Sequence, residues 1–226
     1  MGGRPMDTST IWTSQLWWYL ARAGGIVAWV LLAASMIWGL LLSTKLLGRR
    51  PHPAWVTDLH RFLGGLSVVF TAVHVAALVL DSYVSFGPAE VLVPFASHWR
   101  PAAVAWGVIA TYLLVAIEVT SLLRHRLPRR AWRATHLLSF PLFGLGTLHA
   151  LTAGTDAGTV AWQLVLAMAG ATVLGLTAAR QVRTRPYDGA GGGLKGGPGD
   201  ATAAAGDARQ AQLARARAVA GSRRRR

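Results

Sequence analysis

Five apolar stretches separated by short polar connections dominate the chain. Each is long enough to cross a hydrocarbon layer of about 30 Å, which takes roughly 20 helical residues. They cover residues 24–47, 59–80, 102–123, 131–151 and 160–178. Lipid offers no hydrogen bonds to an exposed backbone, so each stretch is predicted to be a helix. The sequence therefore predicts an all-α polytopic membrane helix bundle with about five transmembrane helices.

Arginines mark alternate connections between these stretches. They follow the first and fifth stretches and fill the connection between the third and fourth, at Arg49, Arg50, Arg124, Arg126, Arg129, Arg130, Arg180, Arg183 and Arg185. Residues 81–100 hold only Arg100, and residues 152–159 hold no cation. Cytoplasmic loops are enriched in such cations, so we expect the N-terminus outside and the C-terminus in the cytoplasm of a cell (plasma) membrane.

Composition narrows the class of protein. The chain has 226 residues, 53% hydrophobic content, 14% charged residues and ten tryptophans, a profile too apolar for an ordinary soluble domain. The formal net charge of +14 lies in the connections and the tail, so we expect no nucleic-acid partner. The absence of cysteine excludes disulfides, thiolate metal sites and cysteine nucleophiles.

Three regions are expected along the chain. Residues 1–23 form an interfacial N-terminal segment rich in aromatic residues, including Trp17, Trp18 and Tyr19. Residues 24–178 form the transmembrane bundle. Residues 179–226 are rich in Gly, Ala and Arg and cannot bury a core, so they are predicted to be a disordered basic cytoplasmic tail.

Two apolar stretches carry a histidine at each end. His60 and His74 bound HRFLGGLSVVFTAVH, where fourteen steps give about four helical turns and a rise of about 21 Å. His136 and His149 bound HLLSFPLFGLGTLH, where thirteen steps leave the second ring about 140° short of four turns. Pro141 lies between them, and a kink there would correct part of that difference in phase.

The two histidine stretches are separated by one other, so they run in the same direction and their histidines match in depth. Two imidazoles facing each other at each of two depths is the arrangement that holds two haems by both axial positions. We expect His60 and His136 to ligate an inner haem iron, and His74 and His149 an outer one. Glycines beside each pair would leave room for a macrocycle, at Gly64, Gly65, Gly144 and Gly146.

Haem propionates need cations near the membrane surfaces. Arg61 and Arg133 are the candidates at the inner level, and Arg100 and Arg22 at the outer level. The other interpretation of these histidines is that they pack structurally or bind a divalent ion in a haem-free transporter or assembly scaffold.

The paired histidines resemble the ferric reductase-like transmembrane domain family, shared by ferric reductases, NADPH oxidases and the haem-binding subunit of the bacterial methionine sulfoxide reductase system. In that family two helices separated by one other carry histidine pairs with thirteen and twelve intervening residues, as His60, His74, His136 and His149 do here. The resemblance covers roughly residues 24–178. It implies b-type haem and electron transfer across the membrane to ferric iron, oxygen, quinone or a partner protein outside.

The larger members of this family have six spans and cytoplasmic flavin and nicotinamide domains. This chain has five predicted spans and no nucleotide-binding motif, so flavin and NAD(P)H are expected only through a separate cytoplasmic flavoprotein reductase. The chain would then be the electron-transfer subunit of an oxidoreductase. A quinol-oxidising cytochrome b-like subunit of a redox complex uses similar histidine spacing and stays open as an alternative.

Overall fold

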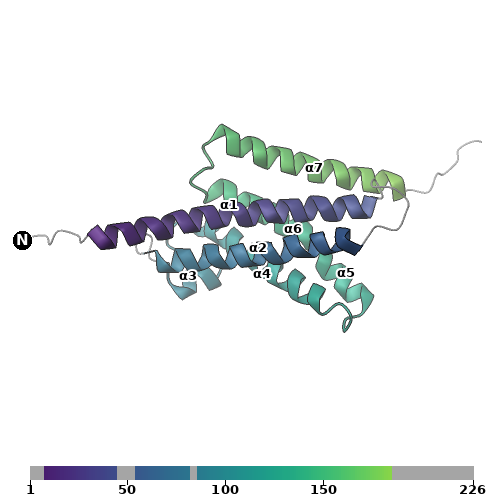
Figure 1. Cartoon of the computed structure of the whole chain (residues 1–226), viewed down its shortest axis with the longest axis horizontal. Helices are drawn as coiled ribbons and strands as arrows, with labels where there is room; N and C mark the ends of the chain where they lie inside the picture. The colour runs from purple at the N-terminus through teal and green to yellow at the C-terminus, as the bar shows by residue number, and fades with distance from the viewer. Residues whose placement is uncertain (1–7, 45–53, 82–85, 185–226) are drawn as a thin grey trace, which may run out of the picture. The chain divides into compact units, whose positions relative to one another are not determined.

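The computed structural model describes residues 8–44, 54–81 and 86–184, and every regular element in them is an α-helix. The helices are α1 (Thr8–Thr44), α2 (Ala54–Leu80), α3 (Pro88–Leu92), α4 (Pro101–Leu122), α5 (Arg129–Leu137), α6 (Ser139–Thr152) and α7 (Val160–Thr184). The all-α bundle that the sequence predicts is confirmed (Figure 1).

Four of the described helices are long and apolar enough to cross a membrane. They are Gln15–Thr44 within α1, Ala54–Leu80, Pro101–Leu122 and Val160–Val182 within α7. The remaining predicted span, residues 131–151, is divided into α5 and α6 at Leu138. Most of the predicted tail, from residue 185 on, lies outside the described residues, and α7 itself continues to Thr184.

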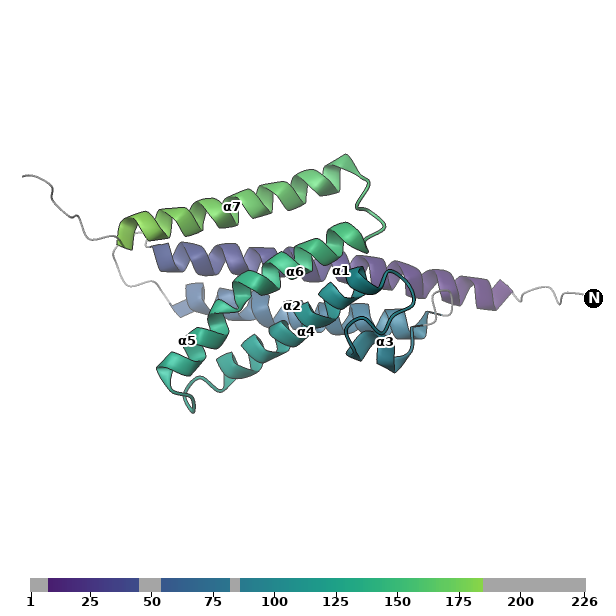
Figure 2. The same cartoon turned by 180° about the vertical axis from the view of Figure 1, so that it is seen from behind.

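Helices α5 and α6 are divided at Leu138, just before the first turn of α6, which contains Pro141. Proline has no N–H, and its ring clashes with the carbonyl four residues earlier, which here belongs to Leu137. Leu138 accordingly has φ −64° and ψ −7°, and its N–H bonds to the Thr135 carbonyl in a tightened turn. The chain changes direction there, as the two opposite views show (Figures 1 and 2).

Helix α1 runs antiparallel beside α2 and also contacts α6 and α7, while α4 packs along α6 (Figures 1 and 2). Two apolar clusters join these helices. One combines Trp29, Met36 and Leu40 of α1 with Phe143 of α6 and Leu166 of α7. The other combines buried residues of α4 with Leu142 of α6, at Ala110, Leu114 and Ile117.

Large apolar side chains also cover the outside of the bundle. On α7, Leu164, Met168 and Leu174 are 57%, 70% and 72% exposed. Such a face is stable where it meets lipid in place of water. The bundle therefore has the exterior of a multi-pass membrane protein.

Candidate functional site

The structure brings the four predicted histidines into two facing pairs. His60 of α2 faces His136 of α5, with ring centres 6.1 Å apart and ring planes at 78°. His74 of α2 faces His149 of α6, with ring centres 6.3 Å apart and planes at 77°. All four rings are half-buried. The two pairs have nearly the same geometry although the helix carrying His136 and His149 is broken between them.

These distances fit one metal between each pair of rings. An imidazole nitrogen lies about 2 Å from a bound transition metal and about 1 Å from its own ring centre, so ring centres on opposite sides of one metal are about 6 Å apart. The described residues hold no group of three or more His, Cys, Asp or Glu side chains suited to a metal ion. A haem iron needs only two protein ligands, since the macrocycle supplies the rest.

Three of the four imidazoles donate their Nδ1–H to a backbone carbonyl of a neighbouring helix. The bonds run from His74 to Ala21 (2.6 Å), from His60 to Ser35 (3.1 Å) and from His149 to Ala103 (2.8 Å). A carbonyl only accepts, so Nδ1 carries the hydrogen and the lone pair of Nε2 is left for a metal. Such bonds hold the ring orientation and raise the basicity of the ligand.

A glycine follows each of these three carbonyls by four residues, at Gly25, Gly39 and Gly107. A Cβ added at these positions would lie 2.9 Å from His74 Nδ1, 3.0 Å from His60 Cε1 and 2.7 Å from His149 Cε1. Helical Cβ atoms point toward the N-terminus, so the residue at i+4 covers the carbonyl at i. Only glycine leaves that carbonyl open to an imidazole.

Sequence reasoning did not find these glycines, although a signal for them exists. Gly25 and Gly39 are fourteen residues apart, the same interval as His60 and His74. Helices α1 and α2 run antiparallel, and the interval between the two glycines equals that between the two histidines. Gly25 therefore lies opposite His74, and Gly39 lies opposite His60. Of the glycines that were expected to make room, Gly146 lines the cavity that contains His74 and His149. A Cβ on Gly64 would instead meet the Glu118 carboxylate at 3.3 Å, and one on Gly144 would meet no atom within 4 Å.

His136 differs from the other three histidines. Its Nδ1 is buried and has no hydrogen-bond partner in the part of the chain that the structure describes, and the same holds for Trp132 Nε1. The two rings stack with centres 5.2 Å apart and planes at 21°. Helix α4 has no glycine after Gly107, so at this depth it exposes no carbonyl of the kind that His149 uses.

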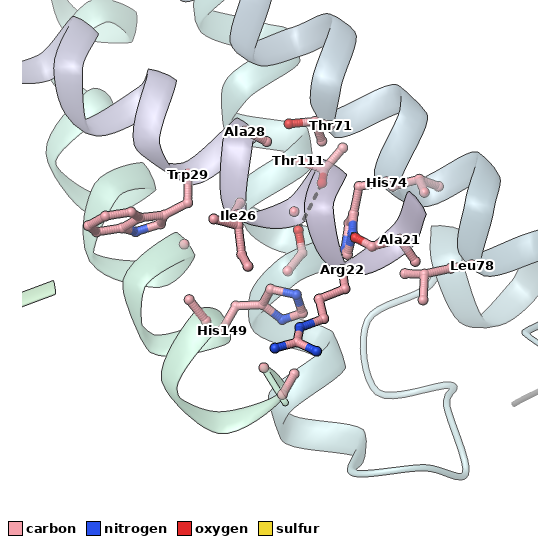
Figure 3. Close-up of a pocket in the computed structure, with 18 of the residues that line it drawn as sticks. Ala21, Arg22, Ile26, Ala28, Trp29, Thr71, His74, Leu78, Thr111 and His149 are labelled. Atoms are coloured by element: carbon pink, nitrogen blue, oxygen red, sulfur yellow. Dashed lines mark hydrogen bonds between the residues drawn. The ribbon is translucent and has the colours of Figure 1, made fainter. Parts of the chain in front are cut away.

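A cavity of about 390 Å³ lies beside the His74–His149 pair. His74 and His149 line it together with Gly25 and Trp29 of α1 and Thr111 of α4. Figure 3 shows the two imidazoles projecting from different helices, with the Arg22 side chain close to them. The volume lies within the range of pockets that bind small molecules and cofactors.

Two of the predicted arginines lie at the end of the bundle that holds His74 and His149, and both have protein partners. Arg22 forms an ion pair with Asp156 through both Nε (2.8 Å) and Nη2. Arg100 precedes α4 with φ 42° and donates from Nη1 to the Thr152 carbonyl at 2.7 Å. Both arginines therefore connect other helices to the segment that follows His149.

At the other end, Arg61 and Arg133 are exposed. Arg61 lies 3.7 Å from Asp58, one turn earlier on the same helix, and Arg133 lies one turn before His136 on α5. The structure thus places each predicted cation at the same end of the bundle as its histidine pair.

Comparison with protein families gives a match over residues 13–147 to the family described as ferric reductase like transmembrane component. The matched range contains three of the four histidines and ends two residues before His149. Comparison with curated proteins and with solved structures gives no match.

Proposed function

The chain belongs to the ferric reductase-like transmembrane family, whose members are membrane electron-transfer components, and from that premise we propose that it is a di-haem b-type cytochrome. His60 and His136 would ligate the inner haem iron, and His74 and His149 the outer one. The observation that carries the proposal is the pair of facing imidazoles at each of two depths, with ring centres 6.1 and 6.3 Å apart.

The contribution of the protein is to position and orient the ligands. Ala21, Ser35 and Ala103 accept the Nδ1–H of three histidines, and this sets the tautomer in which Nε2 is free. When bound, haem supplies a one-electron couple whose potential depends on its axial ligands and on burial.

Apolar packing separates the two depths. Ser67 of α2 is 1% exposed and donates to the Gly64 carbonyl at 2.7 Å, so its hydroxyl is satisfied within its own helix. Leu142 and Leu114 are buried at 3% and 7% exposure in the cluster between α4 and α6. These three residues also line the cavity beside His74 and His149, so the side chains between the two proposed sites are buried and largely apolar.

The proposed direction of transfer follows the distribution of charge. Arg129, Arg130 and Arg133 on α5 are exposed and would dock an acidic cytoplasmic flavoprotein that carries flavin and draws on NAD(P)H. Electrons would leave at the outer haem to ferric iron, oxygen, quinone or a partner protein. The proposed location is the plasma membrane, and the same arginine pattern supports an N-terminus outside.

The test is the haem content of the purified full chain with its dithionite-reduced spectrum. We expect two b-type haems per protein, and one in the double variant His74→Leu/His149→Leu. His98→Leu is the matched control, because His98 is exposed and lies outside both pairs, and it should keep both haems. A wild-type protein without protoporphyrin, or a double variant that keeps two haems, would refute the proposal.

A second measurement identifies the electron donor. Reduction of the haems by a flavin reductase with reduced nicotinamide is expected. Reduction by a quinol analogue alone would instead support a quinol-oxidising subunit.

A further inference from the structure

The four histidines are not held equally. His60, His74 and His149 each bond to a carbonyl of another helix, at a position that a glycine leaves open. His136 has no such bond among the described residues, and its stacking partner Trp132 belongs to the same helix. In the part of the chain that the structure describes, the one aromatic ring of another helix that the His136 imidazole contacts is that of His60.

Helix α5, which carries His136, packs against α4, but none of its nine residues is fully buried. Its one side-chain hydrogen bond, from Thr135 to the Ala131 carbonyl, is internal. Within the described residues no hydrogen bond or ion pair joins a side chain of α5 to another helix, and the turn at Leu138 separates it from α6. By contrast, α6 has Leu142 and Phe143 buried in the bundle.

We propose that His136 is an exchangeable axial ligand, so that the inner haem accepts a small uncharged ligand on its α5 side while the outer haem does not. This inference rests on the proposed function. In the exchange, the bond between His136 Nε2 and iron breaks and a bond between the incoming ligand and iron forms, with no electron or proton transferred. Movement of α5 about Leu138 would carry His136 and Trp132 away together.

The size of the effect follows from the missing bond. Loss of the partner that orients a metal-bound imidazole weakens metal binding by about 10–100-fold. A competing ligand should therefore bind the inner haem about 10–100-fold more tightly than the outer one. Carbon monoxide is the probe, because it is small and uncharged and its binding to reduced haem is read directly in a difference spectrum.

The first experiment titrates carbon monoxide into the reduced full chain. We expect one of the two haems to respond. In His74→Leu/His149→Leu, which keeps the inner haem, all of the remaining haem should bind carbon monoxide. In His60→Leu/His136→Leu, which keeps the outer haem, none should bind over the same concentration range.

A second variant tests the cause without removing a ligand. Gly107→Ala places a Cβ 2.7 Å from His149 Cε1 and displaces that ring from the Ala103 carbonyl. This variant should hold the outer haem less tightly, and the outer haem that stays bound after reconstitution with excess haemin should bind carbon monoxide as well. Gly144 lies on α6, and a Cβ added there would meet no atom within 4 Å. Gly144→Ala is therefore the matched control and should behave as the wild type.

Binding of carbon monoxide by both haems of the wild type, by neither, or by the outer haem alone would overturn the inference while leaving the di-haem proposal intact. So would a Gly107→Ala protein whose retained outer haem stays unreactive. Absence of haem from the wild-type protein would remove both proposals, and the haem content measured beforehand distinguishes that case.

Discussion

Replacing Gly25 by alanine should selectively weaken the outer haem site. Gly25 lies on α1 against His74, whose Nδ1 bonds to the Ala21 carbonyl at 2.6 Å. An alanine Cβ would lie 2.9 Å from that Nδ1 and 3.0 Å from Cε1. Alanine is the better helix former by about 1 kcal/mol. Any loss of haem therefore comes from the contact with His74 and not from a weaker α1.

The magnitude follows from these distances. Non-bonded heavy atoms prefer a separation of about 3.5 Å or more, so the ring must move by about 0.6 Å and its bond to Ala21 is lost or distorted. Overpacking of this kind costs about 1–3 kcal/mol, and a lost hydrogen bond costs about 1 kcal/mol. Together these give about 2–4 kcal/mol, which is roughly 30- to 1,000-fold in outer haem affinity.

The assay is the ratio of haem to protein after purification, followed by titration of the apoprotein with haemin. Gly25→Ala should fall from two haems toward one while the inner haem stays bound. Gly144→Ala serves as control, since the same substitution there meets open space, and it should keep both haems. A Gly25→Ala protein with two haems and wild-type affinity would show that α1 does not position His74.

Three further substitutions test neighbouring contacts by the same haem assay. Gly39→Ala, whose Cβ would lie 3.0 Å from His60 Cε1, should lower inner haem content and spare the outer site; the opposite selectivity would refute the register between α1 and α2. Ser35→Ala removes a hydroxyl contact at 3.3 Å but keeps the carbonyl at 3.1 Å, so the inner haem should be retained, and its loss would mean that the hydroxyl holds the ring. Asp156→Asn removes an exposed, solvent-screened ion pair with Arg22, so haem content and melting temperature should change little, whereas loss of the outer haem would assign the pair a positioning role.

Much of the fold could be predicted because lipid restricts the alternatives. A long apolar stretch in a membrane must be a helix, and four of the five predicted spans appear as single long helices. Within the fourth predicted span, the kink expected from Pro141 is present, at Leu138. Apolar composition continues across Leu138, so hydropathy did not show that the span would divide into α5 and α6.

The sequence by itself determined which residues form the candidate site. Fourteen- and thirteen-residue intervals set the depths of His60, His74, His136 and His149, because rise and rotation along one helix depend only on residue number. The family followed from the same spacing.

Tertiary structure alone decided which helix supports each histidine. In a bundle whose helices are apolar on every side, hydropathy does not select neighbours, so lateral order depends on how closely the backbones approach. That approach places Gly25, Gly39 and Gly107 against three imidazoles, while His136 has no carbonyl partner among the described residues. The four histidines are therefore held unequally, because packing between the described helices supplies a carbonyl bond to three of them.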